Sequence, residues 1–228
     1  MSQPPREPPL SAVAGDEPVL LEMEAEAARR DFPIVGRHVG ITLEVLARAI
    51  GAARVLELGS GFGYSAYWFS RAVGAGGELH LTDTDPDNLR RAEEYLGRAG
   101  LGQPVHTHVG DALETLERLT GEFDVVFSDI DKDDYPRAWR AAAGRIRTGG
   151  LYLCDNVLGW GGARVYEQEG EGRTAERIRA VREHNRSVLQ DEHFIATILP
   201  IRYGVMTALR LVPPASSSRD GRGRPGTA

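Results

Sequence analysis

Residues 55–65 read VLELGSGFGYS and decide the fold. An apolar run passes through three glycines, Gly59, Gly61 and Gly63, into a segment with a helical pattern. Glycines at this point permit a tight turn and let the backbone approach a ligand closely. The ligand would then lie beside the amino terminus of the helix. The stretch therefore predicts a strand, a binding loop and a helix in that order.

The same alternation of short apolar runs and longer helical patterns continues on both sides of this loop. Strands are expected at Arg54–Leu58, Glu78–Thr82, Val105–Val109, Phe123–Asp129, Leu151–Asp155, Phe194–Pro200 and Met206–Leu211. Helices are expected at Pro18–Arg30, Val39–Ile50, Tyr64–Val73, Pro86–Arg98, Ala112–Leu119, Tyr135–Arg147 and Thr174–Gln190. This alternation predicts an α/β fold, a seven-stranded, mostly parallel sheet with helices on both faces.

The last two expected strands have no helix between them. The turn Ile201-Arg202-Tyr203-Gly204 joins them, so they can pair as an antiparallel hairpin at the carboxyl-terminal end of the chain. A parallel sheet that ends in such a hairpin is typical of the Rossmann-like methyltransferase fold. The strand spacing alone would also suit a dinucleotide-binding domain.

The loop favours a cationic cofactor over a dinucleotide. Tyr64 stands in the sixth position, where the dinucleotide fingerprint has a small residue. Glu57 precedes the loop, and its carboxylate would repel a pyrophosphate. S-adenosylmethionine carries a sulfonium and an ammonium group and no phosphate, so it suits this acid. The alternative for Glu57 is a solvated acid at a strand end.

Two further acids end the next strands. Asp83 is placed to accept the ribose hydroxyls, whereas its rival Asp85 precedes Pro86 and looks like a helix cap. Asp111, after the third strand, could accept the exocyclic amine of adenine beside Ala112. A helix N-cap is an equally good interpretation of Asp111.

Oxygen ligands follow the fourth and fifth strands. Asp129 ends one strand, and Asp155 and Asn156 end the other. Adjacent parallel strands bring their carboxyl ends to one edge, so these side chains can converge there. Oxygen ligands without Cys or His favour Mg²⁺, with Mn²⁺ or Ca²⁺ as possibilities. Taken singly, each acid would more often serve a turn or cap.

The segment Asp129-Ile130-Asp131-Lys132-Asp133-Asp134-Tyr135 resembles the D-x-x-K-x-x-Y stretch of the cation-dependent O-methyltransferases of the catechol and caffeoyl-CoA type. Asp155-Asn156-Val157 resembles their second metal segment, and the similarity extends from about residue 32 to 211. The resemblance implies that Asp129, Asp155 and Asn156 bind the metal and that Lys132 is the general base. The expected cofactor-binding residues are Val35, Gly36, Glu57, Gly59, Ser60, Gly61, Tyr64, Ser65, Asp83, Asp111, Ala112 and Asp129.

The chain departs from this family where the substrate is oriented. Tyr203-Gly204 stands where members commonly have Asp-Gly, and Met206 stands where catechol-type enzymes have a glutamate. Asn185 matches a recurring family position, either structural or near the substrate. Trp160 in the loop 159–173, and the segment before Val35, are expected to contact the substrate, because loops at this edge vary.

The expected reaction is in-line transfer of a methyl group from the sulfonium to a metal-coordinated hydroxyl, with Lys132 taking the proton. A metal that binds two oxygens favours vicinal diols such as catechols. Two alternatives are a nicotinamide-dependent oxidoreductase and a non-catalytic binding protein on the same fold. Tyr64 and Glu57 argue against the former. The intact set of Asp129, Lys132, Asp155 and Asn156 argues against the latter.

Composition agrees with a small-molecule enzyme. The chain has 228 residues, 41% of them hydrophobic, and a net charge of -6 from interspersed charges, which argues against nucleic acid or an anionic membrane as partner.

No signal peptide or membrane span is evident, so a cytoplasmic protein is expected. Cys154, the single cysteine, is expected to be buried and structural. Residues 1–16 and 213–228 are expected to be flexible tails around a methyltransferase domain at 17–212, and related enzymes suggest a homodimer.

Overall fold

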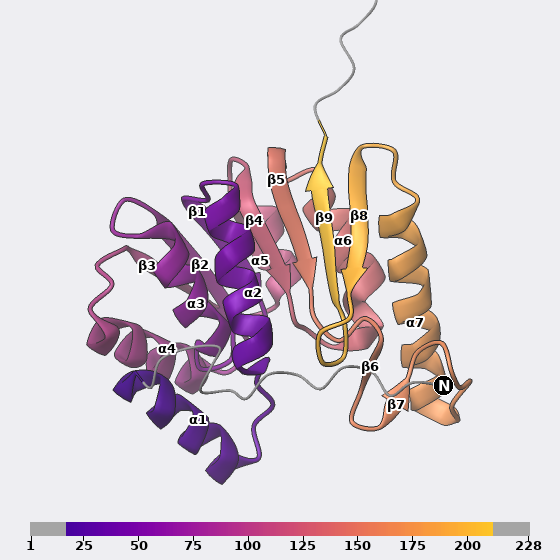
Figure 1. Ribbon diagram of the computed structural model, residues 1–228, viewed down its shortest axis with the longest axis horizontal. Coiled ribbons are helices and arrows are strands. Elements are labelled where there is room, and N and C mark those ends of the chain that lie inside the picture. Colours follow the sequence, from indigo (N-terminus) through magenta and orange to yellow (C-terminus); the bar gives the residue numbers. More distant parts are fainter. Residues whose placement is uncertain (1–16, 212–228) are drawn as a thin grey trace, which may run out of the picture.

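A computed structural model describes residues 17–211, and the two expected tails lie outside them. Its main sheet has the order β3-β2-β1-β4-β5-β9-β8 (Figure 1). The strands of this sheet are β1 (Arg54–Leu58), β2 (Glu78–Asp83), β3 (Val105–Val109), β4 (Phe123–Ser128), β5 (Ile146–Cys154), β8 (Phe194–Leu199) and β9 (Val205–Arg210). Strands β1 to β5 pair in parallel, whereas β9 pairs antiparallel with β5 and β8. The predicted sheet and carboxyl-terminal hairpin are confirmed.

Helices cover both faces of the sheet (Figure 1). They are α1 (Pro18–Arg30), α2 (Gly36–Ala49), α3 (Tyr64–Val73), α4 (Pro86–Ala99), α5 (Ala112–Arg118), α6 (Tyr135–Ala143) and α7 (Gly172–Leu189). One apolar cluster joins the first four helices to one face, and a second joins the last three to the other. Among the described helices, none is long and apolar enough to cross a membrane.

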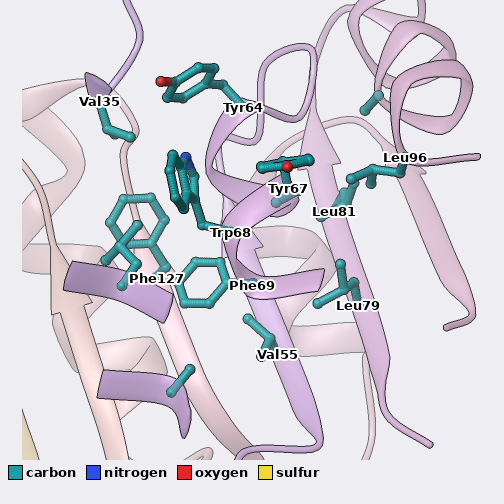
Figure 2. Packing of buried hydrophobic residues seen from close by; sticks show 14 of the residues in the cluster. Val35, Val55, Tyr64, Tyr67, Trp68, Phe69, Leu79, Leu81, Leu96 and Phe127 are labelled. Carbon is teal, nitrogen blue, oxygen red and sulfur yellow. The ribbon is translucent and has the colours of Figure 1, made fainter. Parts of the chain in front are cut away.

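Aromatic side chains fill the first of these clusters. Figure 2 shows Trp68, Phe69 and Phe127 close together between α3 and the sheet, with ring centroids of Phe69 and Phe127 5.7 Å apart. Gly40 on α2 allows this packing, because a Cβ there would lie 2.2 Å from Nε1 of Trp68. The close approach holds α2 against α3, next to the binding loop.

The structure corrects the expected boundary between α6 and β5. We expect a helix through Arg147 and a strand beginning at Leu151, but the helix ends at Ala143 and the strand begins at Ile146. Gly144 follows the helix, and Ile146 pairs with Phe123 across a register shift in the ladder. Pairing with β4 thus overrides the helical pattern. The structure also contains a short hairpin of β6 (Gly159–Trp160) and β7 (Ala163–Arg164), which the sequence patterns do not predict.

The amino-terminal ends of the central strands are fastened by Asp124. Its Oδ2 accepts hydrogen bonds from the amides of Ala53 and Arg54 at 2.8 and 2.6 Å, and its Oδ1 accepts one from Arg147. These contacts hold the pKa of Asp124 below its usual range despite partial burial. One carboxylate therefore ties β1, β4 and β5 together, and the opposite ends of the strands carry the candidate site.

Candidate active site

A cavity of about 1060 Å³ opens at the carboxyl-terminal ends of the parallel strands. The loop after β1, the ends of β2 to β5 and the turn between β8 and β9 all contribute to its wall. Of the expected site residues, those that line it are Val35, Gly59, Ser60, Gly61, Tyr64, Ser65, Asp83, Asp111, Ala112, Asp129, Lys132, Asp155 and Asn156. Glu57 lies buried beneath the loop, and Gly36 packs behind Val35 against Arg202.

The glycine loop is held by its neighbours through the backbone. Gly59 has φ of +83°, and a Cβ there would lie 2.6 Å from the carbonyl oxygen of Asp129, so the loop needs glycine to sit against the end of β4. A Cβ on Gly63 would lie 2.8 Å from that of Ala92 on α4. Gly63 therefore provides the close packing against a helix. In a dinucleotide fingerprint, the small residue at the sixth position serves close packing. Tyr64, which occupies the sixth position here, can therefore turn toward α1.

Tyr64 joins the loop to the first helix. Its hydroxyl donates a hydrogen bond of 2.8 Å to Glu24, which also accepts two from the guanidinium of Arg37. Burial and the Glu24 carboxylate raise the pKa of Tyr64 above its usual value, so the phenol stays protonated. The side chain is 3% exposed and presents its ring to the cavity wall.

Glu57 is fully buried at the end of β1. Neither carboxylate oxygen receives a hydrogen bond from the residues that the structure describes. Burial raises the pKa of Glu57 to about 8, with Ser65 and Ser60 acting in the opposite direction and the charge of Asp129 in the same one. A solvated acid at a strand end is therefore ruled out, and both oxygens of this buried carboxylate are without a hydrogen-bond donor among the described residues.

Asp83 braces the loop as well as facing the cavity. Its Oδ2 accepts from the amide of Gly61 at 3.0 Å, and its Oδ1 accepts from the amide of Asp85 at 2.8 Å and from Asn88 at 3.3 Å. Asp85 caps α4 by accepting from the amide of Asp87, as expected. These bonds hold the Asp83 carboxylate at the carboxyl-terminal end of β2, with lone pairs left over for a ligand.

Asp111 is the N-cap of α5. Its Oδ1 accepts from the amides of Leu113 and Glu114, both at 2.9 Å. The capping interpretation of Asp111 is thus confirmed, while the residue also lines the cavity next to Ala112. Its second oxygen leaves room for a contact with a ligand.

Three oxygen-bearing side chains meet where β4 and β5 end. Nδ2 of Asn156 donates to Oδ2 of Asp155 at 2.9 Å, and Nζ of Lys132 donates to Oδ1 of Asn156 at 3.0 Å. The same ammonium lies 3.6 Å from Oδ1 of Asp129. Asn156 has φ of +60°, a left-handed conformation that asparagine tolerates better than most residues. The predicted convergence of Asp129, Asp155 and Asn156 is observed.

The two carboxylates in this cluster are buried or half-buried, and one of their oxygens lacks a partner among the described residues. Oδ1 of Asp155 is buried and has no hydrogen-bond partner among the described residues. Burial, followed by the charge of Asp129, raises the pKa of Asp155 to about 7. Burial also raises the pKa of Asp129, against the charges of Lys132 and Arg202. A hard divalent cation fits here, since it would provide the missing partner for Asp155 Oδ1.

Lys132 is the only lysine in the chain, whose other Lys-or-Arg positions are all occupied by arginine. It begins a short 3-10 turn (Lys132–Asp134), and its side chain is 12% exposed. The ammonium lies 4.8 Å from the ring centre of Tyr135, whose hydroxyl donates to the carbonyl of Asp155 at 2.7 Å. Lys132 is thus held between the ends of β4 and β5 and faces the cavity.

Arginines that the sequence patterns do not indicate complete the wall. Arg202 in the turn before β9 donates to the carbonyls of Ile34 and Val35, which fastens the segment before α2 over the cavity. Arg177 on α7 pairs with Asp131 and Asp133 of the loop after β4. Neither arginine belongs to a recognisable motif, and only the fold brings them to the site.

Residues that are expected to contact the substrate lie in the cavity wall. Trp160 and Tyr203 both line the cavity, as does the segment Phe32–Val35. Met206 is fully buried in the second apolar cluster and is not part of the wall, so it does not take the place of a substrate-orienting acid. The side chain that reaches the cavity from this turn, besides Tyr203, is Arg202.

Asn185 is structural. Its Nδ2 donates to the carbonyl of Val157 at 2.8 Å and to the hydroxyl of Tyr166 at 3.0 Å. Its Oδ1 shares a hydrogen bond with Nδ1 of His184, whose Nε2 meets the hydroxyl of Tyr152 at 3.0 Å. This buried network ties α7 to the segment after β5 without reaching the cavity. Cys154 is likewise buried, and burial raises its pKa to about 12.

Known proteins resemble this chain over most of its length. A family model described as O-methyltransferase matches residues 10–211. A catechol O-methyltransferase of Mycobacterium tuberculosis is 34% identical over 185 residues, which are 78% of this chain and 84% of the relative.

Two solved structures share the fold over nearly the whole chain. The O-methyltransferase TomG of Streptomyces achromogenes, in complex with S-adenosylmethionine, has a TM-score of 0.78 at 28% identity and covers 89% of this chain and 94% of its own. An O-methyltransferase of Bacillus cereus in complex with S-adenosylhomocysteine has a TM-score of 0.77 at 25% identity, with coverage of 88% and 94%.

Proposed function

The chain belongs to the class I O-methyltransferase family, and we propose from this premise that it transfers the methyl group of S-adenosylmethionine to a metal-coordinated hydroxyl of a small aromatic vicinal diol. The observation that carries the proposal is the meeting of Asp129, Lys132, Asp155 and Asn156 at the wall of the cavity that also contains the glycine loop. The family match favours methyl transfer over the nicotinamide-dependent alternative.

The cofactor side of the cavity suits S-adenosylmethionine, which supplies a methyl group activated by its sulfonium charge. Glu57 would face the positive end of the cofactor, because its buried carboxylate lacks a hydrogen-bond partner among the described residues. Asp83 would accept the ribose hydroxyls, and the backbone around Asp111 and Ala112 would border the adenine. Val35, held by Arg202, would close over the methionine part.

The metal side suits Mg²⁺, held by Asp129, Asp155 and Asn156. A divalent ion at this position lowers the pKa of a hydroxyl that it binds and fixes its direction of approach. The oxygen donor set and the unpartnered Oδ1 of Asp155 support this assignment. Asn156, which donates to Asp155, would direct its own Oδ1 to the ion once Lys132 moves away from it.

Lys132 would accept the proton of the hydroxyl. Lysine can act as a base when its surroundings lower its pKa, whereas arginine stays charged at all accessible pH values. The single lysine of the chain stands at this position, and arginine stands at every other Lys-or-Arg position. Nζ of Lys132 lies 3.0 Å from Oδ1 of Asn156 and 3.6 Å from Oδ1 of Asp129, beside the proposed metal ligands.

The acceptor would lie between Trp160 and Tyr203. Both aromatic residues border the cavity on the side of the oxygen ligands, and Arg164 lies 5.8 Å from the ring centre of Tyr203. Flat aromatic rings pack well between such side chains. Two adjacent hydroxyls would let one oxygen react while the other anchors the ring.

Methyl transfer from labelled S-adenosylmethionine to a panel of catechols, with and without chelator, tests this function. We expect transfer to at least one vicinal diol, its loss with chelator and its recovery with Mg²⁺. Transfer that survives complete metal removal would contradict the metal assignment alone. The absence of transfer to any diol would contradict the substrate class.

A homodimer remains part of the proposal, by resemblance to related enzymes, and a cytoplasmic location remains a proposal from the sequence. Light scattering coupled to size-exclusion chromatography checks the oligomeric state.

A further inference from the structure

Four side chains outside the cavity form a cluster at the β3 edge of the sheet. Glu78 and His80 lie on β2, and His106 and His108 lie on the outer strand β3 (Figure 1). His80 pairs directly with His106 in the parallel register, so all four side chains share one face. None of them lines the cavity. The cluster begins at the amino-terminal end of β2, whereas the catalytic loops follow the other end of the strand.

Three of these side chains offer metal ligands at short mutual distances. Nε2 of His80 is 3.4 Å from Oε1 of Glu78, and Nε2 of His106 is 3.4 Å from Oε2 of the same residue. One ligand atom from each residue lies within 4.8 Å of the other two. Ligands bound to Zn²⁺ at its usual bond lengths in a tetrahedron are about 3.3 Å apart, so small side-chain movements suffice.

The buried histidine supports a ligand independently of this spacing. His80 is 7% exposed, and its Nε2 is buried without a hydrogen-bond partner among the described residues. Its Nδ1 is 3.1 Å from Nε2 of His108. If Nδ1 carries the proton and donates it to His108, a lone pair on Nε2 points toward the Glu78 carboxylate. A cation between them would remove that repulsion.

This arrangement matches the way in which proteins orient metal-binding histidines. A ligating imidazole usually uses its second nitrogen in a hydrogen bond that fixes the ring and its tautomer. His108 provides that bond to His80, and the rings of His80 and His106 stack at a centroid distance of 4.8 Å. The two candidate ligating rings are thus held next to each other.

Arg54 is the competing cation. Its Nε donates to Oε1 of Glu78 at 2.5 Å, while its guanidinium lies 4.3 Å from the ring centre of Phe123. Its Nη1 also donates to the carbonyls of Thr120 and Glu122, so Arg54 is anchored away from His106. Oε2 of Glu78 therefore remains directed at His106. The arginine charge should limit the affinity for a metal without blocking the site.

We propose that Glu78, His80 and His106 bind a late first-row transition-metal ion such as Zn²⁺, with His108 positioning the ring of His80. Two imidazoles and one carboxylate favour such ions, in contrast to the oxygen ligands at the catalytic cavity. The ion would connect the outer strand β3 to β2 and stabilise this edge of the sheet. Half-exposed His106 leaves an open side for water as a further ligand.

Zn²⁺ binding to the full chain without a polyhistidine tag tests the site. The protein is stripped with chelator, and Zn²⁺ is titrated by calorimetry with excess Mg²⁺ present to occupy the oxygen ligands. The wild type should bind one equivalent at this site. His106→Gln should weaken binding on the order of 100-fold, and His108→Gln on the order of 10-fold. His193→Gln, which alters an exposed histidine elsewhere, should bind as the wild type does.

Two further measurements separate this site from the catalytic one and from misfolding. Zn²⁺ should raise the melting temperature of the wild type but not that of His106→Gln, and methyl transfer by His106→Gln with Mg²⁺ should be unchanged. Equal Zn²⁺ affinity and stoichiometry in the wild type and His106→Gln would overturn the proposal. So would an equal Zn²⁺-dependent rise in melting temperature.

Discussion

The two ends of the parallel strands use acidic side chains in opposite ways. At the amino-terminal end, Asp124 accepts from the amides of Ala53 and Arg54 and from the side chain of Arg147, and its pKa is lowered. At the carboxyl-terminal end, Asp155 and Glu57 are buried with unpartnered oxygens, and their pKa values are raised to about 7 and 8.

This contrast distinguishes a structural carboxylate from one prepared for a ligand. A buried acid with a full set of donors stabilises the fold as it stands. A buried acid without partners costs stability until a positive group arrives, and active sites concentrate such groups. The positive groups proposed here are a divalent ion beside Asp155 and the cofactor beside Glu57.

Asp155→Ala should produce the largest effect. It removes the buried ligand between the two metal strands, so kcat should fall by roughly 1,000-fold or more, while S-adenosylmethionine binding should change little. Steady-state kinetics and calorimetry measure the two quantities. Asp133→Ala, an acid of the neighbouring loop that pairs with Arg177, serves as the control and should retain activity. Equal losses of turnover and cofactor affinity would indicate a structural role for Asp155.

Lys132→Met should lower kcat by about 100-fold, a typical contribution of a general base. Part of the loss should be recovered as pH rises, because more of the acceptor is then ionised in solution. The dependence of kcat on pH, measured for both proteins, checks this. An unchanged pH profile with a raised KM would instead assign Lys132 to substrate binding.

Asp124→Ala should affect stability rather than chemistry. It leaves two backbone amides and Arg147 without their acceptor, at a cost of about 2–3 kcal/mol, or a fall in melting temperature of roughly 5–10 °C. Because the folded-state pKa is lowered, this stabilisation is present above the unfolded pKa and is lost as pH falls through the folded value. The gap between wild type and variant should therefore close in acid, as thermal scans would show.

Glu57→Gln should reverse that pH dependence. The raised pKa means that the folded state holds a proton that the unfolded state releases, so Glu57 costs stability as pH rises from about 4.5 toward 8. The variant should be more stable than the ligand-free wild type at pH 8 by roughly 4 kcal/mol, at about 1.4 kcal/mol for each pH unit between 4.5 and 8.

The same variant should bind S-adenosylmethionine about tenfold more weakly at pH 8, since it cannot offer a negative charge. Calorimetry in two buffers of different ionisation enthalpy should also show proton release on binding near pH 7 in the wild type and less in the variant. Equal proton release and equal affinity in both proteins would remove Glu57 from the cofactor site.

Much of the fold and of the cavity could be predicted because both depend on local patterns. Gly59 and Gly63 occupy positions where any side chain would clash, so the loop is visible in the sequence. Asp129 and Asp155 directly follow two consecutive buried strands, β4 and β5, and parallel topology brings such ends together. For these residues, position along the chain determines position in space.

Other features depend on contacts between distant segments and escaped prediction. Arg202 meets Ile34 across 168 residues of sequence, and no motif marks either residue. Met206, which the family resemblance places where catechol-type enzymes have a glutamate, packs in the second apolar cluster. Strand β5 begins earlier than expected, at Ile146, because Ile146 pairs with Phe123 of β4. In these three places the structure is determined by side-chain direction and strand pairing, which local sequence patterns do not show.

The single lysine makes the chain open to a direct spectroscopic measurement. Feeding isotopically labelled lysine during expression would place a label at one side chain only, that of Lys132. If only the ε-methylene carries the label, a nuclear magnetic resonance spectrum would then contain the ε-methylene signal of one lysine and need no residue assignment. Following that signal with pH, with and without Mg²⁺ and S-adenosylhomocysteine, would read the protonation state of one amine through each stage of ligand binding.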